Sequence, residues 1–66
     1  MNIVINGEHK TVSTGITIAQ LVDALKIVPS TIVAELNEVI VGADRYASIC
    51  LLEGDRLEFI RFVGGG

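Results

Sequence analysis

Residues 16–26 read ITIAQLVDALK, and this stretch decides the fold because it predicts the amphipathic helix of the chain. Thr17 and Gln20 have the spacing of a capping box, in which the two side chains satisfy backbone N–H groups at the start of a helix. Apolar residues then recur with the helical period at Ile18, Leu21, Val22 and Leu25. Because Pro29 prevents continuation, the pattern predicts a helix over residues 18–26.

The residues before this helix predict an N-terminal β-hairpin. Residues 2–6 are rich in β-branched side chains that alternate between two faces, and residues 9–13 form the expected returning strand. Asn6 and Gly7 lie between them. This dipeptide is the strongest short hairpin signal, because both residues tolerate a positive φ.

The residues after the helix predict further strands. They are expected at residues 32–36, 39–41 and 57–63, with turns at 37–38 and 53–55 and one helical turn at 46–49. The apolar stripe of a single helix must be buried, and one face of a mixed sheet is the surface available to cover it. The element order therefore predicts an α+β protein of ββαββ type, in which a mixed sheet wraps around one helix. With the first and last strands adjacent at its centre, this is the β-grasp, or ubiquitin-like, arrangement.

Composition excludes several classes of protein. The 66 residues are 50% hydrophobic and 20% charged, which is typical of a small folded domain and not of a disordered chain. One cysteine excludes a disulfide scaffold or a multi-cysteine zinc site. The net charge of −3 argues against nucleic-acid binding, which requires a basic patch. The apolar runs are far shorter than the roughly 20 residues of a membrane span. A lone cysteine and the lack of a secretory signal favour a cytoplasmic protein.

The C-terminal glycines are the most informative feature for function. The chain is expected to consist of a β-grasp domain over residues 1–63 and a flexible tail of Gly64, Gly65 and Gly66. A glycine run has no side chains to pack and loses much backbone entropy when it is ordered. A tail without Cβ atoms can enter a narrow enzyme cleft and place the Gly66 carboxylate beside ATP. From the residues alone, a frayed end or a cloning remnant remains the alternative.

The whole chain resembles the ThiS family of ubiquitin-like sulfur carriers. The resemblance is carried by Asn6-Gly7, Thr17-Ile18 with Leu21, Ala34-Glu35-Leu36-Asn37, Gly54-Asp55 and Phe62-Val63-Gly64-Gly65-Gly66. Gly64 departs from the terminal diglycine of the family by adding a third glycine.

The resemblance implies a cycle of sulfur transfer. A ThiF-type adenylating enzyme would consume ATP to activate the Gly66 carboxylate, and a sulfur donor such as a cysteine desulfurase would convert it to a thiocarboxylate. A ThiG-type thiazole synthase would then receive the sulfur in thiamin biosynthesis. Gly64 and Gly65 would thread into the partner active sites. The family implies a protein that is acted on by enzymes, binds no cofactor or metal itself, and is a monomer when free.

Alternation along the last strand predicts a docking surface. Leu57 and Phe59 share the face assigned to the core, so Ile60 and Phe62 point away from the helix as exposed apolar residues. Aromatic residues are enriched at interface cores, which makes Ile60, Phe62 and the adjacent Val63 candidates for partner docking. Packing against strand neighbours or ordinary exposure is the alternative.

Three other functions stay open. The chain could carry sulfur in another pathway, as the MoaD-like proteins of molybdopterin synthesis do. It could be a ubiquitin-like modifier whose Gly66 forms an isopeptide bond with lysine, or a binding module with an inert tail. Among single residues, His9 is expected to be solvated and Cys50 to be buried as a small hydrophobe. The acidic residues are expected to be dispersed: Glu35, Glu38, Asp44, Glu53, Asp55 and Glu58.

Overall fold

The computed structural model describes residues 1–62, so Val63 and the three terminal glycines lie outside the described part of the chain. Its strands are β1 (Asn2–Ile5), β2 (Glu8–Thr11), β3 (Ile32–Leu36), β4 (Val39–Val41) and β5 (Arg56–Arg61). The helix α1 spans Ile18–Ala24, and two short 3-10 helices follow it, η1 (Pro29–Thr31) and η2 (Ala43–Arg45). No helix within residues 1–62 is long and apolar enough to cross a membrane.

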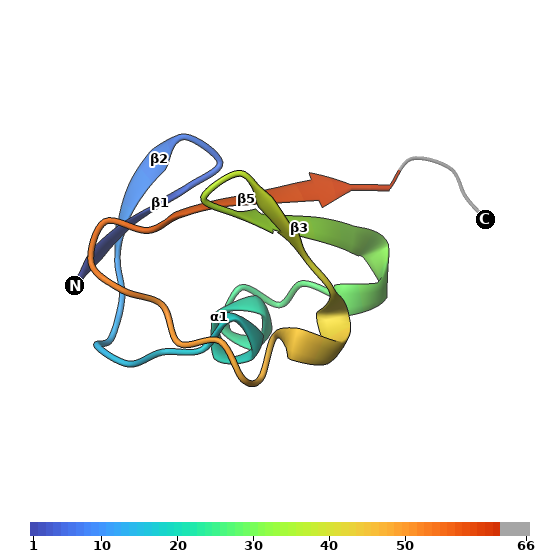
Figure 1. Ribbon diagram of the computed structural model, residues 1–66, viewed down its shortest axis with the longest axis horizontal. Coiled ribbons are helices and arrows are strands. Elements are labelled where there is room, and N and C mark those ends of the chain that lie inside the picture. Colours follow the sequence, from blue (N-terminus) through green and yellow to red (C-terminus); the bar gives the residue numbers. More distant parts are fainter. Residues whose placement is uncertain (63–66) are drawn as a thin grey trace.

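The strands form one mixed sheet in the order β2-β1-β5-β3-β4. The strand β5 runs parallel to β1 and antiparallel to β3, and the pairs β1–β2 and β3–β4 are antiparallel hairpins. Figure 1 shows α1 lying across one face of this sheet, while β5 runs along the long axis towards the end opposite the N-terminus. The first and last strands are therefore neighbours at the centre, which confirms the predicted β-grasp arrangement.

The helix begins as its sequence predicts and ends earlier. Thr17 Oγ1 accepts a hydrogen bond from the Gln20 N–H at 3.0 Å, and Gln20 Oε1 accepts one from the Thr17 N–H at 2.9 Å, which completes the capping box. The helix ends at Ala24 and not at residue 26, because Lys26 adopts a left-handed φ of 58°. The Lys26 N–H donates to the Asp23 carbonyl at 3.0 Å. Lys26 thus occupies the position after the cap where glycine is usual.

The core lies between α1 and the inner face of the sheet. It is formed by Ile3, Ile5, Ile18, Leu21, Val22, Ile32, Ala34, Val41, Tyr46, Leu51 and Leu57. Phe59 is partly buried and packs against this cluster. Each fully buried large apolar side chain contributes roughly 1.5–3 kcal/mol relative to exposure. The prediction that Leu57 and Phe59 face the core is confirmed.

Tight turns close both hairpins. Asn6 and Gly7 have φ values of 50° and 82°, which confirms the predicted turn between β1 and β2. Asn37 and Glu38 have φ values of 50° and 71° in the predicted turn between β3 and β4. Two consecutive left-handed residues match the twist of the flanking strands. Glu38 accepts this conformation despite its Cβ, at a cost of about 1–2 kcal/mol.

Two strands end opposite the first residue of their antiparallel partners. The strand β2 stops at Thr11, not at the predicted residue 13, because Thr11 pairs with Asn2 at the start of β1. Likewise β5 stops at Arg61, not at residue 63, because Arg61 pairs with Ile32 at the start of β3.

The segment between β4 and β5 corrects two predictions. The helical turn expected at residues 46–49 lies instead in η2, three residues earlier, and Tyr46 follows it into the core. The prediction that Cys50 is buried is wrong, because its thiol is exposed. Cys50 forms a single β-bridge with Thr17, so the side chain that points inward belongs to the next residue, Leu51.

Candidate functional site

The last strand is held on both sides, and this fixes the direction in which its side chains point. On one side, Asn6 Oδ1 accepts a hydrogen bond from the Phe59 N–H at 2.8 Å, which continues the pairing with β1 beyond the end of that strand. On the other side, β3 and β5 pair in register over five residue pairs from Ile32–Arg61 to Leu36–Leu57. The strand β5 is therefore hydrogen-bonded along both edges at the centre of the sheet.

The backbone remains bonded as far as the last described residue. The Phe62 N–H donates to the Thr31 carbonyl at 2.9 Å, just beyond the end of β5. Val63 and Gly64, Gly65 and Gly66 lie outside the described residues, so the roles assigned to them remain predictions. In the sequence, the glycine run starts two positions after this hydrogen-bonded residue.

Ile60 and Phe62 are exposed, as alternation predicts. Their exposed fractions are 46% and 61%, whereas Leu57 on the opposite face of the same strand is 1% exposed. Docking through these side chains stays a prediction, but the geometry it requires is present.

Neighbouring strands extend this apolar surface. Val33 on β3 is directly opposite Ile60, and Ile40 on β4, with 68% of its surface exposed, is opposite Glu35. The outer patch is defined here as Val33, Ile40, Ile60 and Phe62. Alternation along 32–36 and 39–41 places Val33 and Ile40 on the face opposite buried Ala34 and Val41, so the signal for them was available in the sequence.

Acidic side chains border the outer patch. Glu35 and Glu58 are direct cross-strand partners on the outer face, and both line a shallow depression together with Glu38 and Arg56. The expectation that the acidic residues are dispersed is wrong for these three carboxylates. The register of β3 and β5 pairs Glu35 with Glu58, and Glu38, in the turn after β3, lines the same depression. Within residues 1–62 the ion pair that forms is Lys10–Glu8, at 3.7 Å on β2.

The remaining chemical candidates do not gather at this face. His9 is exposed on β2, as predicted, and Cys50 is exposed in the segment beside Thr17. No group of three or more histidine, cysteine or acidic side chains within residues 1–62 is arranged to hold a metal ion. The described arrangement, an apolar patch with an acidic border at the base of the C-terminal segment, is suited to binding another protein surface.

Known proteins resemble this chain over its whole length. The model of the ThiS family matches residues 3–66. A thiazole synthase from Paramagnetospirillum magneticum is 36% identical over 66 residues, which cover all of this chain and 20% of that protein. The chain thus spans about a fifth of the length of this relative. The sulfur carrier protein ThiS from Bacillus subtilis is 34% identical over 50 residues, 76% of each chain.

A solved structure has the same fold. The crystal structure of the thiamine biosynthesis protein ThiS from Geobacter metallireducens superposes with a TM-score of 0.87 at 30% sequence identity, and the match covers all of both chains.

Proposed function

The chain belongs to the ThiS family, and from this premise we propose that it is a sulfur carrier of thiamin biosynthesis. The observation that carries the proposal is the match of the family model through the terminal glycines, to residue 66, on a β-grasp domain. The similarity to the sulfur carrier protein ThiS of Bacillus subtilis supports it.

The working group of the carrier is the carboxylate of Gly66. On a ThiF-type enzyme this carboxylate attacks the α-phosphorus of ATP and displaces pyrophosphate, which gives an acyl-adenylate with AMP as a good leaving group. The outer sulfur of a persulfide, such as one made by a cysteine desulfurase, then displaces AMP to form an acyl disulfide. A second thiol cleaves this disulfide, which leaves the thiocarboxylate on Gly66 and a disulfide between the two thiols. The partner enzymes supply the catalysis and consume the ATP, so the carrier itself needs neither an acid–base pair nor a bound cofactor.

The acceptor of the sulfur is a ThiG-type thiazole synthase. The similarity of the whole chain to a fifth of a thiazole synthase from Paramagnetospirillum magneticum supports this choice, because a stretch similar to this chain then belongs to a protein named as the synthase. It also favours the thiamin pathway over the molybdopterin pathway. The cytoplasm suits this chemistry, because an exposed thiol such as that of Cys50 persists in a reducing compartment.

The β-grasp domain is the part of the carrier that these enzymes bind. Ile60 and Phe62 of the outer patch, with Val63 next in the chain, dock on the partner, while Gly64 and Gly65 pass through its cleft. Support comes from the exposure of Ile60 and Phe62 at the last hydrogen-bonded stretch before the glycines. An aromatic side chain at such a position is a typical anchor of an interface core.

Intact-protein mass spectrometry tests the proposal. The chain is incubated with ATP, a ThiF-type enzyme and a sulfur donor, and the mass is expected to rise by the exchange of one oxygen for sulfur at Gly66. A chain that lacks Gly66 is the control, and it should fold normally without acquiring sulfur. High-mass conjugates would instead indicate a protein modifier, and an unchanged mass with an enzyme active on its own carrier would indicate an inert tail.

A further inference from the structure

The hydrogen-bonded pairing between β3 and β5 stops at Phe62, beside the 3-10 helix η1. In an antiparallel sheet, the two residues of a hydrogen-bonded pair exchange both N–H···O bonds. The Phe62 N–H donates to the Thr31 carbonyl at 2.9 Å, but the Thr31 N–H donates to the Val28 carbonyl at 2.9 Å, which closes η1. The pair is therefore half formed, because η1 uses the N–H that would otherwise donate to the Phe62 carbonyl.

The next hydrogen-bonded position before β3 is occupied by Pro29. The two strands keep one register over five residue pairs, and hydrogen-bonded pairs alternate with non-hydrogen-bonded ones. Continued beyond Phe62, this register would place Gly64 opposite Pro29. Proline has no N–H to donate, and the Pro29 carbonyl already accepts a hydrogen bond from the Ile32 N–H. The described residues 29 and 31 therefore offer no free N–H to a strand that continues β5.

Two ordinary reasons for a proline do not apply to Pro29. It is not needed to end α1, which ends at Ala24 and is followed by the left-handed Lys26. It is not needed for the core either, because η1 contains no buried residue. The turn itself is reinforced by Thr31, whose Oγ1 donates to the Val28 carbonyl at 2.6 Å. Figure 1 shows η1, in green, at the same end of the molecule as the end of β5.

We propose that Pro29 and Thr31 are positioning residues that prevent β3 from pairing with the C-terminal residues, so that the Gly66 carboxylate stays available to the adenylating enzyme. Four residues follow Phe62, and an extended chain spans at most about 3.3–3.6 Å per residue. Pairing as far as Gly64 would leave only the last two residues to enter the enzyme. This inference rests on the proposed function, because it concerns delivery of Gly66 to a ThiF-type enzyme.

The proposal predicts what a restored donor does. In Pro29→Val, residue 29 regains an N–H and carries a side chain that favours extended backbone, so the C-terminal residues can pair with β3. A paired chain is not competent for adenylation, and the apparent affinity falls with the competent fraction. One ladder hydrogen bond shifts such an equilibrium about fivefold. The KM for the carrier should therefore rise about fivefold, with kcat at saturation unchanged.

The experiment measures pyrophosphate release by a ThiF-type enzyme and, by NMR, hydrogen exchange of the Gly64 amide. Pro29→Val should raise KM and slow this exchange about fivefold, without lowering the midpoint of thermal unfolding. Ser30→Val is the matched control, because it adds the same side chain at a position that is not hydrogen-bonded in this register. It should leave KM and exchange unchanged.

Thr31 supplies a second pair of variants. Thr31→Val removes the hydroxyl that donates to the Val28 carbonyl, so it weakens η1 and should change KM and Gly64 exchange in the same direction as Pro29→Val, by about twofold. Thr31→Ser keeps a hydroxyl at this position and should restore the values of the parent chain. This rescue distinguishes the hydrogen bond from the bulk of the side chain.

The outcomes separate this inference from the function beneath it. If the parent chain is adenylated and Pro29→Val keeps its KM and its Gly64 exchange, the inference is wrong while the carrier function stands. A higher KM with unchanged Gly64 exchange would mean that Pro29 contacts the enzyme directly, which also overturns the inference. Equal effects in Ser30→Val would overturn it as well. If the parent chain releases no pyrophosphate with a competent enzyme, the proposed function fails, and Gly64 exchange still tests whether Pro29 controls the pairing.

Discussion

The two faces of β5 carry similar side chains and do different work. Leu57 and Phe59 point to the helix and belong to the core or pack against it, whereas Ile60 and Phe62 point away and are exposed. All four are large and apolar, so hydrophobicity does not distinguish core from contact surface in this strand. Position does, because successive side chains of a strand alternate between its faces. The inner face therefore determines stability, and the outer face is available for recognition.

The largest effect is expected from a truncation on the inner face. Leu57→Ala should lower the free energy of unfolding by about 2–5 kcal/mol, because it removes buried methyl groups and leaves a cavity. A domain of 66 residues has only a modest core, so much of the population should unfold. Urea denaturation followed by circular dichroism measures the change. A loss below about 1 kcal/mol would show that the inner face is not what holds the sheet to the helix.

The matching truncation on the outer face should affect docking and spare the fold. Phe62→Ala is expected to change the unfolding free energy by no more than about 0.5 kcal/mol, since the ring is largely exposed. It should raise the KM for the carrier in adenylation by about thirtyfold, the loss of roughly 2 kcal/mol typical of an aromatic anchor. A large fall in the melting temperature would place Phe62 in the core and remove the distinction between the faces.

A third change tests what holds β5 so that its faces are separated. Asn6→Ala should lower the free energy of unfolding by about 1–2 kcal/mol, because it removes the acceptor of the Phe59 N–H and places alanine in a left-handed conformation. Amide hydrogen exchange should show faster exchange at Phe59 in particular. Unchanged protection there would mean that the pairing with β3 alone positions the strand.

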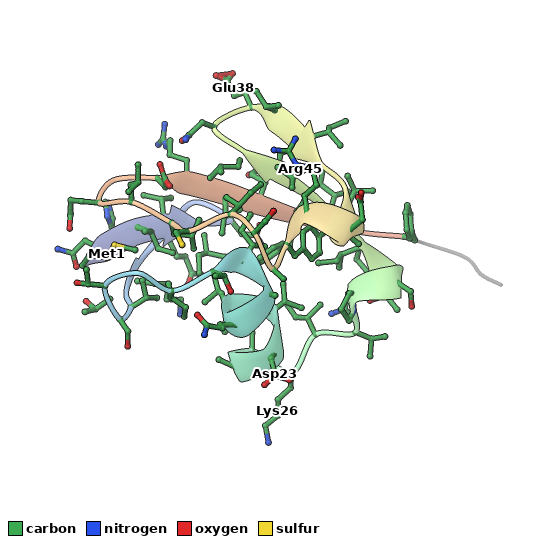
Figure 2. All side chains as sticks on the ribbon, turned by 60° about the horizontal axis from the view of Figure 1, so that its bottom comes forward. Met1, Asp23, Lys26, Glu38 and Arg45 are labelled. Atoms are coloured by element: carbon green, nitrogen blue, oxygen red, sulfur yellow. The ribbon has the colours of Figure 1, made fainter. Side chains whose placement is uncertain are left out.

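The smallest effect is a gain on the side of the helix. Lys26→Gly should raise the free energy of unfolding by about 0.5–1 kcal/mol, because glycine adopts the left-handed conformation after the helix cap without a Cβ penalty. Adenylation kinetics should stay unchanged, since Lys26 lies on the helical side of the molecule (Figure 2). A changed KM would show that partners also contact this side.

Local signals account for the predictions that succeeded. Thr17 and Gln20 identify the start of the helix because both bonds of the capping box form within one turn. Asn6 and Gly7 identify the first hairpin because each can adopt a positive φ. The end of the helix lies two residues before the predicted one, because the sequence carries no local signal for the left-handed conformation of Lys26. The local signal that the sequence does offer for the end of the helix is Pro29, which lies further along the chain.

The sequence by itself determined the helix, the five strands and their order, although not all of their ends. It also determined the face of β5 that enters the core and the exposure of Ile60 and Phe62. These follow from spacing along a single helix or strand, which is a property of neighbouring residues. Only the tertiary structure decided that Glu35 and Glu58 oppose one another and that Leu51 takes the core position expected for Cys50. Both depend on which distant segments pair and in which register, and burial of the whole core selects that register, because a slip by one residue would turn every side chain to the other face.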